Sequence, residues 1–124
     1  MNLWEIRTGH YPIYALGSDA ECQVMSYIDK LAEDNPAEHK KVVARLDTVA
    51  ENGPPRNKEQ NRPLDHKCYE LKMSQTRIAY FWEKNRMIIC TMAFPKKGQK
   101  TPKRILNQVY DIKRRYDNES TQES

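Results

Sequence analysis

The chain is predicted to be an α+β protein, in which an N-terminal strand and a helical hairpin pack on an antiparallel β-meander and a further helix closes the chain. Three observations predict this class. Two helix-start signals lie in the first fifty residues, three β-type runs follow between residues 68 and 94, and another helix-start signal lies at Thr101-Pro102. At 124 residues the chain has room for one core, which buries about two thirds of the unfolded surface.

The first elements are predicted to be a strand and a helix. Leu3–Thr8 can form a short strand, and the residues that follow, through Gly17, are expected to be a loop. Ser18 and Glu21 have the spacing of a capping box, so we predict a helix over residues 19–33. The apolar residues that recur at helical spacing in it are Val24, Ile28 and Leu31.

A second helix is predicted to begin at Asn35-Pro36, with Glu38 repeating the start signal, because proline is favoured at the first helical position. Asn52-Gly53, followed by two prolines, ends this helix, and the polar segment to about Asn61 is predicted to be a loop. The two helices are therefore predicted to be antiparallel neighbours. The apolar stripe of the second helix is Val42, Leu46 and Val49.

The second half is predicted to contain a three-stranded meander and the closing helix. The β-type runs are Cys68–Met73, Arg77–Glu83 and Met87–Phe94. The segments between them are as short as hairpin turns, so we predict that the three strands pair antiparallel. A helix after Thr101-Pro102 would place its apolar residues on one side, namely Ile105, Val109, Ile112 and Tyr116. We predict one domain over residues 1–117 and a disordered tail over residues 118–124.

Charge is distributed unevenly along the chain, although the net charge is only +4. Residues 1–50 hold five Lys and Arg against eight Asp and Glu, and residues 51–124 hold sixteen against nine. Five cations and no acid occur within residues 94–104, and no carboxylate lies between Glu83 and Asp111. Such a stretch favours a polyanion, so RNA or DNA is the first partner to consider.

The cysteines and the apolar residues exclude several classes of protein. Cys22, Cys68 and Cys90 are odd in number and show neither Cys-x-x-Cys spacing nor a ligand-spaced histidine. We therefore expect reduced core thiols, no disulfide framework, no metal site and no cofactor. Charged residues interrupt the N-terminus, which excludes a signal h-region, and no run of about 18 apolar residues occurs. We expect a cytoplasmic location and no membrane partner.

Strand alternation brings the candidate functional residues together. In residues 68–73 it places Glu70 and Lys72 on one face, and we place Arg77 and Phe81 of the next strand on the same open face. A single-stranded RNA site needs these residue types, because cations bind phosphates and an aromatic ring can stack on a base. The loop after the meander would add cations from the edge of the sheet, namely Lys96, Lys97 and Lys100.

Three blocks of sequence lie within this order of elements. They are Cys-Tyr-Glu-Leu-Lys at 68–72, Thr-Arg-Ile-Ala-Tyr at 76–80 and Phe-Pro-Lys-Lys-Gly-Gln-Lys-Thr-Pro at 94–102. The blocks resemble the RelE/ParE superfamily of toxins, and within it the HigB-like, phage-related branch. The last two blocks match the family pattern, whereas the first departs from it at Lys72, where the family usually has Arg. The resemblance covers residues 63–116 and implies the small RelE-like fold.

The resemblance also implies a function. The chain would be the toxin of a type II toxin-antitoxin system, a ribosome-dependent mRNA endonuclease (mRNA interferase) that inhibits translation by metal-free attack of a 2′-OH. The implied partners are mRNA, the ribosomal A site, a small helix-turn-helix antitoxin and, for the toxin–antitoxin complex only, promoter DNA. Two alternatives stay open: a ParE-like gyrase inhibitor, against which the basic face argues, and an inactive phage-derived protein that still binds the antitoxin.

RNA cleavage needs a base for the 2′-OH, donors for the phosphate and an acid for the leaving 5′ oxygen. Arg77 is expected to bind the phosphate, because the family has a catalytic Arg at this position; a cross-strand salt bridge with Glu70 or Glu83 is the alternative. Lys72 either positions the phosphate or acts as a base, and Glu70 either acts as a base or only pairs with a cation. His66 is either an acid or base, or an exposed loop histidine. The three loop lysines are expected to contact RNA.

Overall fold

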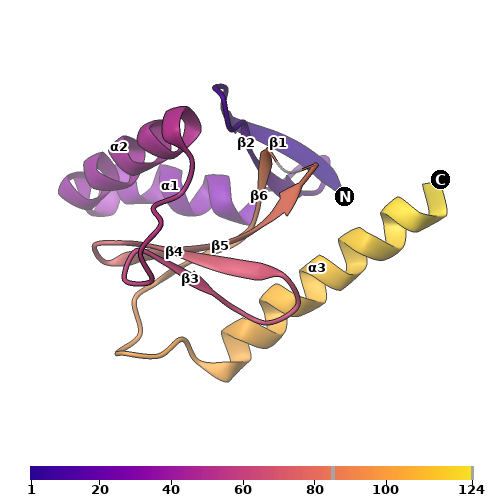
Figure 1. The fold of residues 1–124 in the computed structure, drawn as a ribbon. Coiled ribbons are helices and arrows are strands. Elements are labelled where there is room, and N and C mark those ends of the chain that lie inside the picture. Colours follow the sequence, from indigo (N-terminus) through magenta and orange to yellow (C-terminus); the bar gives the residue numbers. More distant parts are fainter. Residues whose placement is uncertain (85, 124) are drawn as a thin grey trace.

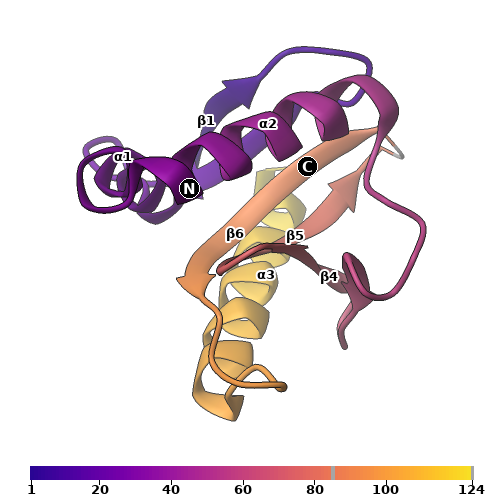
Figure 2. The ribbon, with the colours of Figure 1, turned by 90° about the vertical axis from the view of Figure 1, so that its left-hand side faces the viewer.

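The computed structural model describes residues 1–84 and 86–123 and confirms the α+β class (Figure 1). Its elements are β1 (Asn2–Arg7), β2 (Ile13–Gly17), α1 (Gln23–Asp34), α2 (Pro36–Asn52), β3 (Asn61–Pro63), β4 (Cys68–Met73), β5 (Thr76–Glu83), β6 (Met87–Pro95) and α3 (Lys103–Glu123). They form three layers, in which α1 and α2 cover one face of the sheet and α3 crosses the other (Figures 1 and 2).

The sheet has six strands in the order β1-β2-β6-β5-β4-β3. The predicted meander is confirmed, since β4 pairs with β5 and β5 with β6, both antiparallel. The pairing of β2 with β6 is parallel, and it joins the N-terminal hairpin of β1 and β2 to the meander. The sheet is therefore mixed, with β1 at one edge and β3 at the other.

One strand lies where the sequence predicted a loop, and another, which was not predicted, begins where the second predicted loop ends. β2 follows Pro12 directly, and its residues Ile13, Ala15 and Leu16 are buried. β2 is stabilised by pairing with β1, which precedes it, and with β6, which is distant in sequence. Local periodicity does not reveal such partners. β3 is short and contains Pro63, which suits an edge strand because proline cannot donate a ladder hydrogen bond.

The two predicted helix starts differ in outcome. Ser18 Oγ does accept the backbone N–H of Glu21 at 3.0 Å, but this bond closes a turn, and α1 begins only after Cys22. The predicted start at residue 19 was therefore too early. The start of α2 is confirmed, because the Asn35 side chain accepts the backbone N–H of Glu38 at 3.3 Å and Pro36 is the first helical residue.

A β-bulge divides the residues of β6 between the two faces of the sheet. The register of β5 and β6 shifts between Ala79 and Tyr80, where Thr91 Oγ1 donates to the carbonyl of Ala79 at 3.2 Å. Cys90 before the bulge packs in the core beneath α1 and α2, whereas Phe94 after it packs with α3. The chain thus leaves β6 on the α3 side of the sheet.

The closing helix covers part of the face that the sequence predicted to be open. Ile105 and Val109 of α3 pack on Cys68, Ala79 and Phe94, all of which are buried. The part of this face at the β4–β5 turn is not covered by α3, and it lies beside the loop that leads into α3. Helix α3 crosses the sheet at an angle (Figure 2), and it packs on Cys68, Ala79 and Phe94 near its start and on Phe81 farther along.

The helix α3 also continues past Asp117, to Glu123, so residues 118–123 of the predicted tail are helical, and Ser124 lies outside the described residues. The amino group of Met1 forms an ion pair with Glu119 at 2.7 Å, which ties the last turns of α3 to the first strand. This contact joins residues at opposite ends of the chain, and therefore no local pattern predicts it.

Candidate nucleic-acid-binding site

A cavity of about 270 Å³ lies between the ends of β4 and β5 and the loop from Lys96 to Thr101. It is lined by Glu59, Glu70, Lys72, Arg77, Lys96, Lys97, Gly98, Gln99, Lys100 and Thr101. Every residue predicted for the site is in this set except His66 and Phe81. The structure therefore brings together the cations of the two strands and the cations of the loop, as expected.

The central pair of the cavity is Lys72 and Arg77, which lie directly opposite each other on β4 and β5. Like charges at opposed positions destabilise a sheet. Among the described residues, no carboxylate forms an ion pair with either side chain. An anion bound between them would offset their repulsion, so this pair has the electrostatics of a phosphate site.

The β4–β5 turn orients Arg77. Its Nη1 donates to the carbonyl oxygens of Ser74 at 3.0 Å and Thr76 at 3.1 Å. The alternative salt bridges are not formed, since Glu70 pairs with Arg62 and Glu83 accepts a hydrogen bond from a tyrosine of α3. The guanidinium is thus fixed at one nitrogen by the backbone, and its other donors can bind phosphate oxygens in a fixed fork.

Glu38 on α2 holds this turn from the opposite face of the sheet. Its Oε2 accepts from the backbone N–H of Gln75 at 2.9 Å and from Thr76 Oγ1 at 2.8 Å. Burial by itself would raise the pKa of Glu38, but hydrogen bonds from Thr76, Ser74 and Gln75 outweigh it and lower the pKa. The sequence indicated Glu38 only as a helix-start residue, so its second role was missed.

Glu70 joins three segments of the chain. Its side chain is only 1% exposed. One carboxylate oxygen accepts a short hydrogen bond from Thr101 Oγ1, and the other lies 3.4 Å from Arg62 Nη2. Because both oxygens are engaged, this geometry fits a positioning role better than the predicted role of a base. Arg62 and Thr101 were not predicted as site residues, because their contacts with Glu70 link segments far apart in sequence.

The loop after β6 is fixed to the β4–β5 turn and carries the remaining cations. The backbone N–H of Lys96 donates to the carbonyl of Gln75 at 2.8 Å. Gly98 has a φ of 67°, a conformation that favours glycine, and it lets the loop turn back toward α3. Lys96, Lys97 and Lys100 are all exposed, so their ammonium groups can reach a bound polyanion.

Phe81 does not belong to the site, and the prediction of an exposed stacking platform was wrong. Its side chain is 1% exposed because α3 covers it. The ring centroid of Tyr116 lies 5.0 Å from that of Phe81, and Lys113 Nζ lies 4.8 Å from it. The sequence did place Tyr116 on the apolar side of the last helix. This position was the sequence signal that the helix could cover Phe81.

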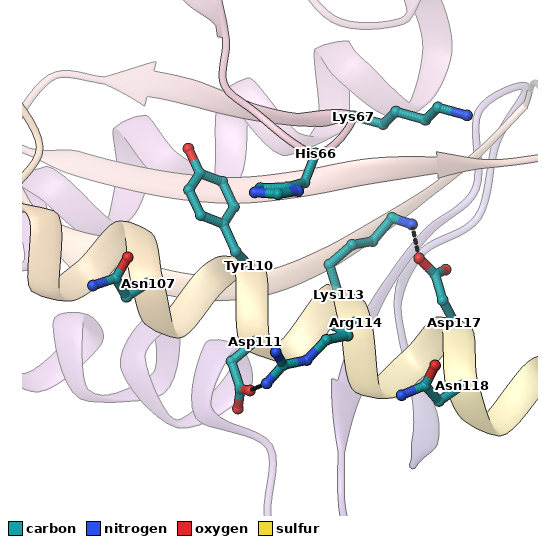
Figure 3. Close-up of a pocket in the computed structure, with 9 residues that line it drawn as sticks. All are labelled: His66, Lys67, Asn107, Tyr110, Asp111, Lys113, Arg114, Asp117 and Asn118. Carbon is teal, nitrogen blue, oxygen red and sulfur yellow. Dashed lines mark hydrogen bonds and ion pairs between the residues drawn. The ribbon is translucent and has the colours of Figure 1, made fainter.

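His66 lies in a separate groove, between the β3–β4 turn and α3 (Figure 3). The groove and the cavity at Arg77 share no lining residue. The ring of His66 packs on Tyr110, with 4.6 Å between the centroids. The structure therefore does not bring His66 to the phosphate site, and its predicted role as acid or base beside Arg77 is not retained.

The cysteines are free and buried, as the sequence predicted for core thiols. Burial raises the pKa of Cys68 to about 11 and that of Cys90 to about 12, so both thiols are protonated at neutral pH. Within residues 1–84 and 86–123, no group of three or more His, Cys, Asp or Glu side chains is arranged to hold a metal ion. No helix in the same ranges is long and apolar enough to cross a membrane.

Comparison with known proteins gives one family. Residues 23–116 match the family described as phage derived protein Gp49-like (DUF891). The match runs from the first residue of α1 into α3 and includes the whole cavity around Arg77. No curated protein matches the chain at a significant level.

Proposed function

The chain belongs to the phage-derived Gp49-like family, a RelE/HigB-like toxin family of toxin–antitoxin systems, and from this premise we propose that it is a toxin that cuts mRNA on the ribosome. The family is related to RelE-type toxins, which are endoribonucleases. In this proposal the chain is of the HigB type and acts in the cytoplasm, where it enters the ribosomal A site.

One observation carries the proposal: the opposed cations Lys72 and Arg77 share a cavity with the loop lysines. Five cations and two carboxylates line this cavity, and one of the carboxylates, Glu70, is already paired with Arg62. A surface of this charge binds the phosphates of a nucleic acid. The cavity lies at the surface beside exposed lysines and is not a deep pocket. A surface site of this kind suits a chain-like substrate.

The proposed reaction needs only groups that line the cavity. Glu59 takes the proton of the 2′-OH, since it lies in the cavity and forms no ion pair with a described residue. As the bond from O2′ to phosphorus forms, the bond from phosphorus to O5′ breaks. A loop ammonium, Lys100, gives a proton to O5′. The products are a 2′,3′-cyclic phosphate and a 5′-OH, and Arg77 and Lys72 stabilise the charge on the phosphate oxygens.

The family implies an antitoxin as partner. We propose that this antitoxin is a small helix-turn-helix protein and that only the complex of the two proteins binds promoter DNA. A ParE-like action on gyrase would need a protein-binding surface, and nothing in the cavity favours it over RNA. The two functions differ in what stops first after induction, which is protein synthesis for an mRNA endonuclease and DNA replication for a gyrase inhibitor.

Expression in growing cells tests the proposal. We expect the wild-type chain to stop growth and protein synthesis, and Arg77→Ala to abolish the arrest while remaining folded. Arg56→Ala is the matched control, because Arg56 is exposed in the loop after α2 and lines a different hollow. Arrest by the folded Arg77→Ala protein would show that the assignment of the cavity is wrong.

A further inference from the structure

The groove that holds His66 is a second hollow on the side of the sheet that faces α3. It has a volume of about 850 Å³ and lies between the β3–β4 turn and the middle of α3 (Figure 3). His66 and Lys67 come from the turn, and Asn107 and Tyr110 come from the helix. The proposed cleavage reaction uses none of these residues, so the groove needs a separate explanation.

The turn that carries His66 is strained. The backbone N–H of Cys68 donates to the carbonyl of Asp65 at 3.1 Å, which closes a four-residue turn. The central residues have positive φ, 58° at His66 and 61° at Lys67. This is the backbone of a type I′ turn, where Asn-Gly is strongly preferred and a bulky side chain is unfavourable. Histidine occurs at positive φ more often than most residues, but Asn-Gly would serve the hairpin better, so the turn alone does not account for the imidazole.

The strained turn holds an aromatic surface in the groove. His66 packs on Tyr110 with 4.6 Å between ring centroids and 59° between ring planes. Tyr110 is itself fixed, because its hydroxyl oxygen accepts the backbone N–H of Asp65 at 3.2 Å. His66 remains exposed in the groove. The result is a rigid ring, supported from behind and open to a ligand, which is how proteins stack an unpaired base.

The charges around the groove favour a base over a cluster of phosphates. Lys113 Nζ pairs with Asp117 at 2.6 Å, and Arg114 pairs with Asp111, so most of the charge on the walls is neutralised within α3. Lys67 forms no ion pair with a described residue and can bind a single phosphate beside the ring. A stacking surface, one cation and the amide of Asn107 together match one nucleotide.

A strip of exposed residues on α3 connects the groove with the cavity at Arg77. Lys100 lines that cavity, and Lys103 and Arg104 are exposed in the first turn of the helix. Asn107 follows one turn later on the same side, because residues three and four apart are neighbours on a helix. From Lys103 to Tyr110 the helix rises about 10 Å, at about 1.5 Å per residue. An RNA strand held at Arg77 can therefore follow the strip to His66.

We propose that the groove binds an unpaired base of single-stranded RNA, stacked on His66, a few nucleotides from the phosphate at Arg77. This inference rests on the proposed function, since it gives the mRNA a second contact that helps to set where it is cut. The imidazole acts here as a flat surface and takes no part in proton transfer.

Binding of a short unpaired RNA whose 2′-OH groups are methylated, so that it lacks the nucleophile, tests the proposal by fluorescence anisotropy. His66→Asn removes the ring and should weaken binding about tenfold, since loss of one base stack has an effect of this order. His66→Phe keeps a ring and should bind as the wild type does. His10→Asn is the control, because His10 is exposed in the turn between β1 and β2.

The melting temperature gives an independent readout. If His66 served only to stabilise the fold, its replacement by Asn would lower the melting temperature. Asn tolerates positive φ better than His does, so His66→Asn should melt at a temperature equal to or about 4 °C above that of the wild type, even though it binds RNA less well. A single abasic nucleotide in the RNA should lower the affinity of the wild type about tenfold. The same change should not lower the affinity of His66→Asn any further, because that variant has no ring on which the base could stack.

Three results would overturn the proposal: unchanged RNA affinity in His66→Asn, equal losses in His66→Phe and His66→Asn, or a loss of antitoxin binding with RNA binding intact. The last would make the groove a protein-docking surface. The assay does not depend on cleavage. If RNA affinity depends on the ring but the chain cuts no mRNA, base binding in the groove is supported and the proposed nuclease function fails.

Discussion

Lys72 and Arg77 face each other across β4 and β5, with no described carboxylate paired to either. The arrangement costs the sheet some stability, and the remaining cations of the cavity increase the repulsion. Natural sequences accept such costs at functional sites. Two buried glutamates, Glu38 and Glu70, hold the surroundings of this pair.

Neutralising one member of the pair should separate stability from binding. Lys72→Gln removes the repulsion and should raise the free energy of unfolding by about 0.5 kcal/mol. It should also weaken RNA binding and lower the slope of log K against log salt by about 0.7, the value for one phosphate contact on a single strand. Urea unfolding and salt titration measure the two effects. Lys58→Gln, at an exposed loop position, should change neither quantity.

The stability contributed by Glu38 should depend on pH in the acid range. Its pKa in the folded protein lies below the ordinary value of 4.5, so the folded state favours the carboxylate. The stabilisation is therefore present above about pH 4.5 and is lost as the pH falls through the folded pKa. Glu38→Gln should cost about 1–2 kcal/mol at pH 7, and the difference from the wild type should shrink below pH 4.

Urea unfolding at a series of pH values measures this dependence, with Glu51→Gln as the control, since Glu51 is exposed on the same helix. A difference between wild type and Glu38→Gln that stays constant from pH 7 to pH 3 would contradict the assigned hydrogen bonds.

Removing the charge of Glu70 should loosen the start of α3. Glu70→Gln leaves Arg62 without its counter-ion and presents an amide N–H₂ to a donor, so we expect a loss of about 3 kcal/mol in the free energy of unfolding. Amide hydrogen exchange should become faster at Ile105 and Leu106, whose N–H groups close the first turn on Pro102. The exposed Glu33→Gln should be neutral. Normal exchange at these two amides would rule out a positioning role for Glu70.

The sequence was most informative where local pattern and burial agree. The bounds of β4 were predicted without error, because its residues alternate between a core face and a polar face. The start of α2 was also predicted, since Asn35 and Pro36 act on their immediate neighbours. The cations of the cavity follow from the same alternation together with the basic loop after β6.

The features that were missed depend on contacts between distant residues. β2 is a strand because it pairs with β6, and Phe81 is covered because Tyr116 of α3 packs on it. The hydrogen bond of Glu70 with Thr101 joins residues 31 positions apart, and that of Glu38 with Thr76 joins residues 38 apart. Periodicity shows which residues are buried, but it does not show what buries them.

The most direct test of the central claim is primer extension on cellular mRNA after induction of the chain, with and without a block of translation. The proposal predicts cuts within translated mRNA that vanish when translation is blocked and that are absent with Arg77→Ala but present with Arg56→Ala. Cuts that persist without translation, or intact mRNA in cells whose growth has stopped, would contradict it.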